Sequence, residues 1–143
     1  MERMTQEERN LLIQDLCARL PYGVIVKKEY TFVFTNGTIS KSKEIEKLDL
    51  EDIEYLISGD DCVDVLKPYL RTMSSMTEEE QNEFVKFHCT TLCPIVMDSA
   101  LTVENESSMI DWLNEKMFDF RGLIKKRLAI KVTPENNPYD ILI

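Results

Sequence analysis

An Asn36-Gly37 pair stands between two stretches of strand-forming residues, and this is the feature that most constrains the fold. Residues 24–34 hold Val, Ile, Tyr and Phe at a density typical of strands, and Thr38–Ser40 begins a second such stretch. A tight hairpin needs residues that tolerate positive φ, and both Asn and Gly do. The sequence therefore predicts an antiparallel hairpin, with Lys27–Glu29 as a candidate turn inside its first stretch.

Two capping boxes predict two helices. In each box a Thr side chain accepts the N–H of a Glu three residues later, and the Glu side chain accepts the N–H of the Thr. The boxes at Thr5–Glu8 and Thr77–Glu80 begin helices that we predict over residues 5–20 and 77–89. The first helix continues with apolar residues at three- and four-residue steps, as an amphipathic helix requires, and Glu78 and Glu79 suit the positive N-terminal end of the second.

Weaker patterns fill the rest of the chain. A third helix is expected after Ser107 or Ser108, a short fourth over 121–128 and a last strand over 129–132, while 50–57 fits either a short helix or a strand. Residues 133–143 are expected to form an irregular C-terminal tail. The sequence thus predicts one α+β domain over residues 1–143, with a small antiparallel sheet of about three to five strands packed by three to four helices.

The composition is acidic. Lys and Arg number 17 against 26 Asp and Glu, which gives a formal net charge of −9. Since proteins bind duplexes by neutralising phosphates with cations, this charge disfavours duplex nucleic acid as a partner. No stretch approaches the roughly 20 apolar residues that cross a bilayer, and no apolar leader begins the chain. We therefore expect a cytoplasmic protein with reduced cysteines and no membrane contact.

The charge is unevenly distributed. Residues 120–143 carry five cations and two anions, whereas residues 49–64 hold seven acids and no Lys or Arg. Either these regions balance each other within the molecule, or the acids form a face for a basic partner or imitate nucleic acid. The candidate acidic face comprises Asp49, Glu51, Asp52, Glu54, Asp60, Asp61 and Asp64.

Four residues are of the types that bind soft metals. His88, Cys89 and Cys93 lie close in the sequence, with Cys62 elsewhere. Structural zinc needs four ligands, usually from two closely spaced pairs, and a second pair is missing, so packed thiols are the simpler interpretation. No Gly-rich phosphate loop or Gly-x-Ser-x-Gly motif is present. We expect no enzyme activity, no bound metal and no cofactor; the alternative is a metal-dependent factor or enzyme that uses these four residues.

Three segments taken together resemble a known family. They are residues 16–24, residues 65–77, and residues 111–114 followed by 118–124. In their order and in their residues they resemble a family of short uncharacterised proteins of gut anaerobic bacteria and their phages and prophages. Where that family usually has Pro, Tyr and Gly this chain has Thr72, Phe120 and Arg127, and where it often has His this chain has Glu115–Met117. The resemblance implies a phage or mobile-element context in a bacterial host cell.

Aromatic and arginine residues in these segments are of the types that dominate binding hot spots. The candidate hot spot comprises Tyr69, Arg71, Trp112, Asp119 and Arg121. Trp112 fits the role of a core anchor better than that of a ligand platform. We expect a small acidic accessory protein that binds a macromolecule, foremost a protein, and in a sharper form inhibits a host protein. A structural virion component is a further alternative, and the sequence leaves the oligomeric state open.

Overall fold

The first helix, α1 (Gln6–Arg19), begins at the predicted capping box. In the computed structural model, which describes residues 4–58, 63–92 and 103–141, the Thr5 side chain accepts the N–H of Glu8, and the Glu8 side chain accepts that of Thr5. The inward face of α1 holds the expected leucines. It also holds Asp15 and Arg19, which are completely buried although they are charged.

A long hairpin follows α1. Strand β1 (Ile25–Val33) pairs with β2 (Ile39–Lys47) along its whole length, which confirms the predicted hairpin. Five residues, 34–38, lie between the two strands: Phe34 donates its N–H to Thr38 O, and Gly37 donates its N–H to Phe34 O. Of the Asn36-Gly37 pair, only Gly37 has a positive φ, 86°. Gly37 therefore supplies the left-handed residue with which this loop reverses the chain between the two strands.

The candidate turn at Lys27–Glu29 is wrong, because β1 runs through it without a break. Its residues pair with β2 on one side and with β3 (Val63–Leu70) on the other; Lys28, for example, lies opposite Glu44 and opposite Leu66. A central strand has both of its edges hydrogen-bonded, and this pairing outweighs the local preference of Lys and Glu for a turn.

The sheet has four strands in the order β2-β1-β3-β4. Strand β1 is antiparallel to both β2 and β3, whereas β4 (Ile130–Lys131) pairs parallel to β3 through Tyr69 and Leu70. The α+β class is therefore confirmed, but the sheet is mixed, not purely antiparallel. Strand β4 has two residues, which pair with the last two residues of β3.

The structure resolves the ambiguous segment 50–57 as a helix, α2 (Leu50–Ser58). The other helices are α3 (Glu78–Leu92), α5 (Val103–Glu115) and α6 (Pro138–Ile141). Helix α5 begins before the predicted serine caps, and α6 gives the predicted irregular tail a turn of helix. Within the described residues, none of the helices is long and apolar enough to cross a bilayer.

The fourth helix predicted over 121–128 is absent from the structure, which shows a series of turns there. Gly122 and Arg127 have positive φ values of 78° and 64°, which a right-handed helix excludes. In addition, the Asp119 carboxylate accepts the N–H groups of Leu123 and Ile124 at 2.8 and 2.9 Å. These bonds satisfy the backbone without a helix.

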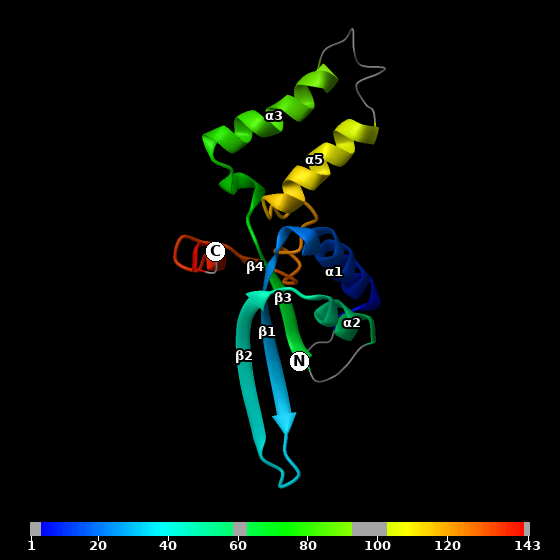
Figure 1. Cartoon of the computed structure of the whole chain (residues 1–143), viewed down its shortest axis with the longest axis vertical. Helices are drawn as coiled ribbons and strands as arrows, with labels where there is room; N and C mark the ends of the chain where they lie inside the picture. Colours follow the sequence, from blue (N-terminus) through cyan, green and yellow to red (C-terminus); the bar gives the residue numbers. More distant parts are fainter. Residues whose placement is uncertain (1–3, 59–62, 93–102, 142–143) are drawn as a thin grey trace.

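Figure 1 shows an elongated molecule, with the β1–β2 hairpin at one end and the α3–α5 pair at the other. Helices α1 and α2 pack side by side against one face of the sheet, and α6 lies on the opposite side. The core forms where these elements meet, in the middle of the molecule. Its buried members are Leu12, Leu16, Val24, Val26, Leu48, Ile53, Leu66, Leu70, Met117, Leu123, Leu128 and Ala129.

Candidate functional site

Phe118 lies where the three family-like segments meet. The N–H of Arg71, just after β3, donates to Met117 O at 2.7 Å, and the N–H of Asp119 donates to Arg71 O at 2.8 Å. The ring of Trp112 on α5 stacks on the Phe118 ring with 5.6 Å between centroids. The fully buried Phe118 therefore joins the end of β3 to α5 and to the loop that follows it.

The Arg71 side chain is held in place by two hydrogen bonds to Glu80. Its Nη1 and Nη2 donate to the two carboxylate oxygens of Glu80 at 2.7 and 2.6 Å, a bidentate geometry. Glu80 also accepts the N–H of Thr77 in the second predicted capping box. The hydrogen bond from Arg71 is the main reason that the pKa of Glu80 is lowered to about 2.

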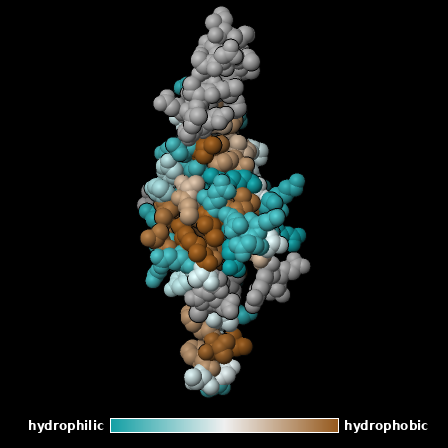
Figure 2. Space-filling view, turned by 90° about the vertical axis from the view of Figure 1, so that its right-hand side faces the viewer, coloured by the Kyte–Doolittle hydropathy of each residue, from teal (hydrophilic) through white to brown (hydrophobic). Residues whose placement is uncertain are grey.

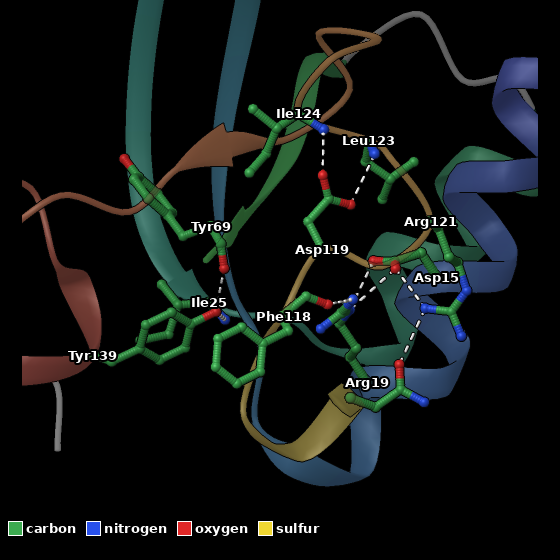
Figure 3. A network of polar contacts seen from close by, with 11 residues as sticks. Asp15, Arg19, Ile25, Tyr69, Phe118, Asp119, Arg121, Leu123, Ile124 and Tyr139 are labelled. Atoms are coloured by element: carbon green, nitrogen blue, oxygen red, sulfur yellow. Dashed lines mark hydrogen bonds and ion pairs between the residues drawn. The ribbon is translucent and has the colours of Figure 1, made fainter. Parts of the chain in front are cut away.

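A buried charge cluster lies beside Phe118, with residues from α1, α5 and the loop after α5 (Figure 3). The Arg19 Nε donates to both carboxylate oxygens of Asp15 at 3.0 Å, and its Nη2 donates to Phe118 O. Arg121 Nη1 reaches Asp15 at 2.6 Å and the side-chain oxygen of Asn114 at 3.0 Å. Two guanidinium groups thus share one buried carboxylate, a pattern that fixes the position of α1.

Tyr69 contributes its backbone and a buried ring. Its carbonyl oxygen accepts the hydroxyl of Tyr139 on α6, and that hydroxyl in turn accepts the N–H of Ile25 (Figure 3). Burial raises the pKa of Tyr139 to about 12. The hydroxyl therefore stays protonated and bridges two neighbouring strands near the end of the sheet.

The structure brings most of the candidate hot spot together, but each of its members makes contacts within the chain. Arg71 and Trp112 hold Phe118, Arg121 holds Asp15, and Asp119 accepts backbone N–H groups of its own loop. Trp112 also donates from Nε1 to Glu83 at 2.8 Å. These contacts give the family-like segments a role in the fold, and we place the interaction surface elsewhere.

In the described part of the acidic face, some acids hold the fold together and others are exposed to solvent. Asp49 and Asp52 accept each other's backbone N–H and so cap α2 reciprocally. Asp52 is buried, whereas Glu51 and Glu54 are exposed. Asp60, Asp61 and the side chain of Asp64 lie outside the described residues. The acids of α2 also lie far along the molecule from those of α3 (Figure 1), so the two groups do not form the single acidic face that an imitation of nucleic acid needs.

Lys28 is the cation that faces these acids. Its Nζ bonds to Asp52 at 2.8 Å and to Glu46, and its side chain is almost fully buried. Burial lowers the pKa of Lys28, but the hydrogen bonds with Asp52 and Glu46 outweigh it, so the pKa lies above its ordinary value. Lys28 therefore stays charged and ties β1 to α2.

An open pocket lies where β1 continues past the end of α2. It has a volume of about 400 Å³, and we call it the β1–α2 pocket. Three aromatic rings and four carboxylates line it, together with the ammonium of Lys28. Its lining residues are Lys28, Tyr30, Phe32, Glu46, Asp49, Glu51, Asp52 and Tyr55.

Beyond this pocket the hairpin carries an apolar tip, which we define as Phe32, Val33, Phe34 and Ile39. Their exposed fractions are 48%, 71%, 53% and 62%. Figure 2 shows this cluster of hydrophobic side chains at the lower end of the molecule, over the hairpin. Exposed apolar side chains that gather on a projecting element differ from the scattered ones found on every surface.

Neither the pocket nor the tip is among the sites that the sequence predicts. The sequence signal for the pocket was the alternation along residues 24–32, where Val24, Val26, Lys28, Tyr30 and Phe32 share one face. The alternative metal set of His88, Cys89, Cys93 and Cys62 falls on side chains outside the described residues. Among the described side chains, no group of three His, Cys, Asp or Glu is placed to hold a metal ion.

Comparison with protein-family models, with curated proteins and with solved structures finds no match to this chain.

Proposed function

We propose that this protein is a non-enzymatic binding module that docks a partner protein through its β1–β2 hairpin. The observation that carries the proposal is the apolar tip, at the end of an element that projects beyond the helices (Figure 1). Folding leaves these side chains in water, and docking against a partner would bury them. Burial of apolar surface is the main favourable contribution to protein association.

The open edge of β2 supports the same proposal. In the described sheet β2 pairs only with β1, so its outer backbone groups are available to an added strand. Lys41 and Lys43 lie on this edge strand, and lysines there disfavour pairing between two copies of one chain. We therefore propose a different protein as the partner. The phage-type context implied by the resemblance makes a bacterial host protein the natural candidate.

Capture from a lysate of gut anaerobic bacteria, followed by mass spectrometry, tests the proposal. The immobilised chain is compared with Val33→Ser/Phe34→Ser, which removes two apolar groups of the tip. The matched control is Ile57→Ser, since Ile57 is an equally exposed apolar residue on α2. We expect a protein that the original chain and the control retain and that the tip variant loses.

Two results contradict the proposal. One is retention of the same proteins by all three chains, which would show that the tip is not the docking element. The other is a stable homo-oligomer of the original chain, in native mass measurements, that dissociates in the tip variant. That result would favour the structural virion alternative, because the tip would then join copies of this chain.

A further inference from the structure

We propose that the β1–α2 pocket binds a cationic side chain, Arg or Lys, presented by a basic segment of the partner protein. That the side chain comes from a partner protein rests on the proposed function. That the side chain is cationic is inferred from the pocket itself, which combines an excess of carboxylates with aromatic rings around an open volume.

The pocket arises from a mismatch in length between β1 and the helix that covers it. Lys28, Tyr30 and Phe32 lie on the face of β1 that packs on α2, two residues apart. Helix α2 is nine residues long and covers this face only as far as the ion pair between Lys28 and Asp52. The two rings that follow extend past the helix, and they form a wall that is open to solvent.

The charge in the pocket is unbalanced. Glu46, Asp49, Glu51 and Asp52 bring four carboxylates against one cation, Lys28, among the lining residues. The Lys28 ammonium is already bonded to Glu46 and Asp52 at the floor of the pocket. The salt bridges of the described residues leave Glu51 at the rim without a cationic partner. A bound cation would therefore find uncompensated negative charge in a partly enclosed site, where it is less screened than on an open surface.

The aromatic rings select the kind of cation. Tyr30 and Phe32 stack with 6.0 Å between their centroids and 20° between their planes, and Tyr55 comes from α2. An ammonium or guanidinium group over such rings gains cation–π attraction, and its aliphatic stem packs on them. Among the described residues no three carboxylates converge to hold a metal ion, so an organic cation fits the pocket better than an inorganic one.

Binding of a defined peptide to the full chain tests the inference. The probe is a twelve-residue peptide of alternating Arg and Ser, and its control has citrulline in place of each Arg, which keeps the shape and removes the charge. Ring-proton signals of Tyr30, Phe32 and Tyr55 are followed by NMR during the titration. We expect saturable shifts of these rings with the arginine peptide only, and weaker binding as salt is added.

Variants locate the binding within the acidic surface. Glu51→Gln neutralises a lining carboxylate and is expected to weaken the arginine peptide about threefold. Glu54→Gln makes the same change on the same helix outside the pocket, and it should leave the affinity unchanged. Phe32→Ala should also weaken binding about threefold, whereas Val33→Ala, the next residue on the other face of β1, should not.

Other outcomes overturn the inference. Equal binding of the citrulline peptide, equal loss in Glu51→Gln and Glu54→Gln, or no binding of the arginine peptide would each exclude a cation pocket. Failure of the inference and failure of the proposed function are distinguishable. If Glu51→Gln retains the captured partner at full affinity while the tip variant loses it, the hairpin docks the partner and the pocket plays no part. If the arginine peptide binds as expected while the tip variant captures the same proteins as the original chain, the cation pocket is supported and docking through the hairpin is contradicted.

Discussion

The guanidinium carbon of Arg71 lies 4.2 Å from the ring centroid of Phe118, and the backbones of the two residues form a parallel bridge. One residue thus joins the end of β3 to the loop after α5 through both its side chain and its main chain. Glu80 holds the same guanidinium with two charge-assisted bonds. Arg71 therefore connects β3, α3 and the segment around Phe118.

The first prediction concerns this connection. Arg71→Gln removes the bidentate pair with Glu80 and the cation–π contact, and it should lower the free energy of unfolding by about 1–3 kcal/mol. Urea denaturation measures the loss. Lys67→Gln removes a cation from the same region of β3 and should change stability by less than about 0.5 kcal/mol. Equal losses in the two variants would show that the loss comes from charge alone.

The second prediction concerns pH. Arg71 holds the pKa of Glu80 at about 2, below the ordinary 4.5. Because the folded-state pKa is the lower one, the pair stabilises fully above about pH 4.5, and this stabilisation is lost as the pH falls towards about 2. The difference in stability between the original chain and Glu80→Gln should therefore be constant near neutral pH and shrink below about pH 4.5. Urea denaturation at several pH values measures it, and a difference independent of pH would contradict the assignment.

The third prediction concerns the hydroxyl of Tyr139, which accepts the N–H of Ile25 at 3.2 Å and donates to Tyr69 O at 2.6 Å. Tyr139→Phe leaves both backbone groups without this partner and should cost about 1–3 kcal/mol. Tyr22→Phe, at an exposed tyrosine, is the control and should be neutral. Thermal unfolding compares the two, and a neutral Tyr139→Phe would show that water replaces the hydroxyl at no cost.

The fourth prediction concerns the buried pair of Lys28 and Asp52. Lys28→Met leaves the Asp52 carboxylate buried without its cation and should cost about 3–5 kcal/mol. Adding Asp52→Asn removes that charge while the side-chain oxygen can still cap α2, so the double variant should be less destabilised than the sum of the single ones. Lys43→Met is the control at an exposed cation. Additive losses in the cycle would exclude direct coupling.

Local signals predicted the parts of the fold that depend on neighbours in the sequence. Thr5 with Glu8 and Thr77 with Glu80 form their capping boxes because all the partners lie within one helical turn. The hairpin at Gly37 is equally local. The helix predicted over 121–128 does not form, because Gly122 and Arg127 have left-handed backbone angles. The Asp119 side chain accepts backbone N–H groups there instead, and the spacing of apolar residues does not reveal this.

The candidate site was harder to predict, because its residues come from distant segments. Asp15 lies on α1, where a polar residue is typical of a solvent-facing helix surface, yet it is buried by partners from beyond residue 113. Likewise, the sequence around Lys28 is typical of a turn, whereas in the structure Lys28 lies in a central strand, beside β3 and paired with Asp52 of α2. The pocket needs both β1 and the short α2, and neither segment alone indicates it.

The contacts that close the fold join residues very far apart in the sequence. Arg19 and Phe118 are separated by 99 residues, Asp15 and Arg121 by 106, and Ile25 and Tyr139 by 114. During synthesis, α1 and the hairpin therefore emerge long before their final partners do. Until then Arg19 lacks the carbonyl of Phe118 and Asp15 lacks the guanidinium of Arg121. Contacts between residues so distant in the sequence slow folding. Until the last segments are made, the apolar core residues that they cover stay exposed, and such exposure makes an incomplete chain prone to aggregate.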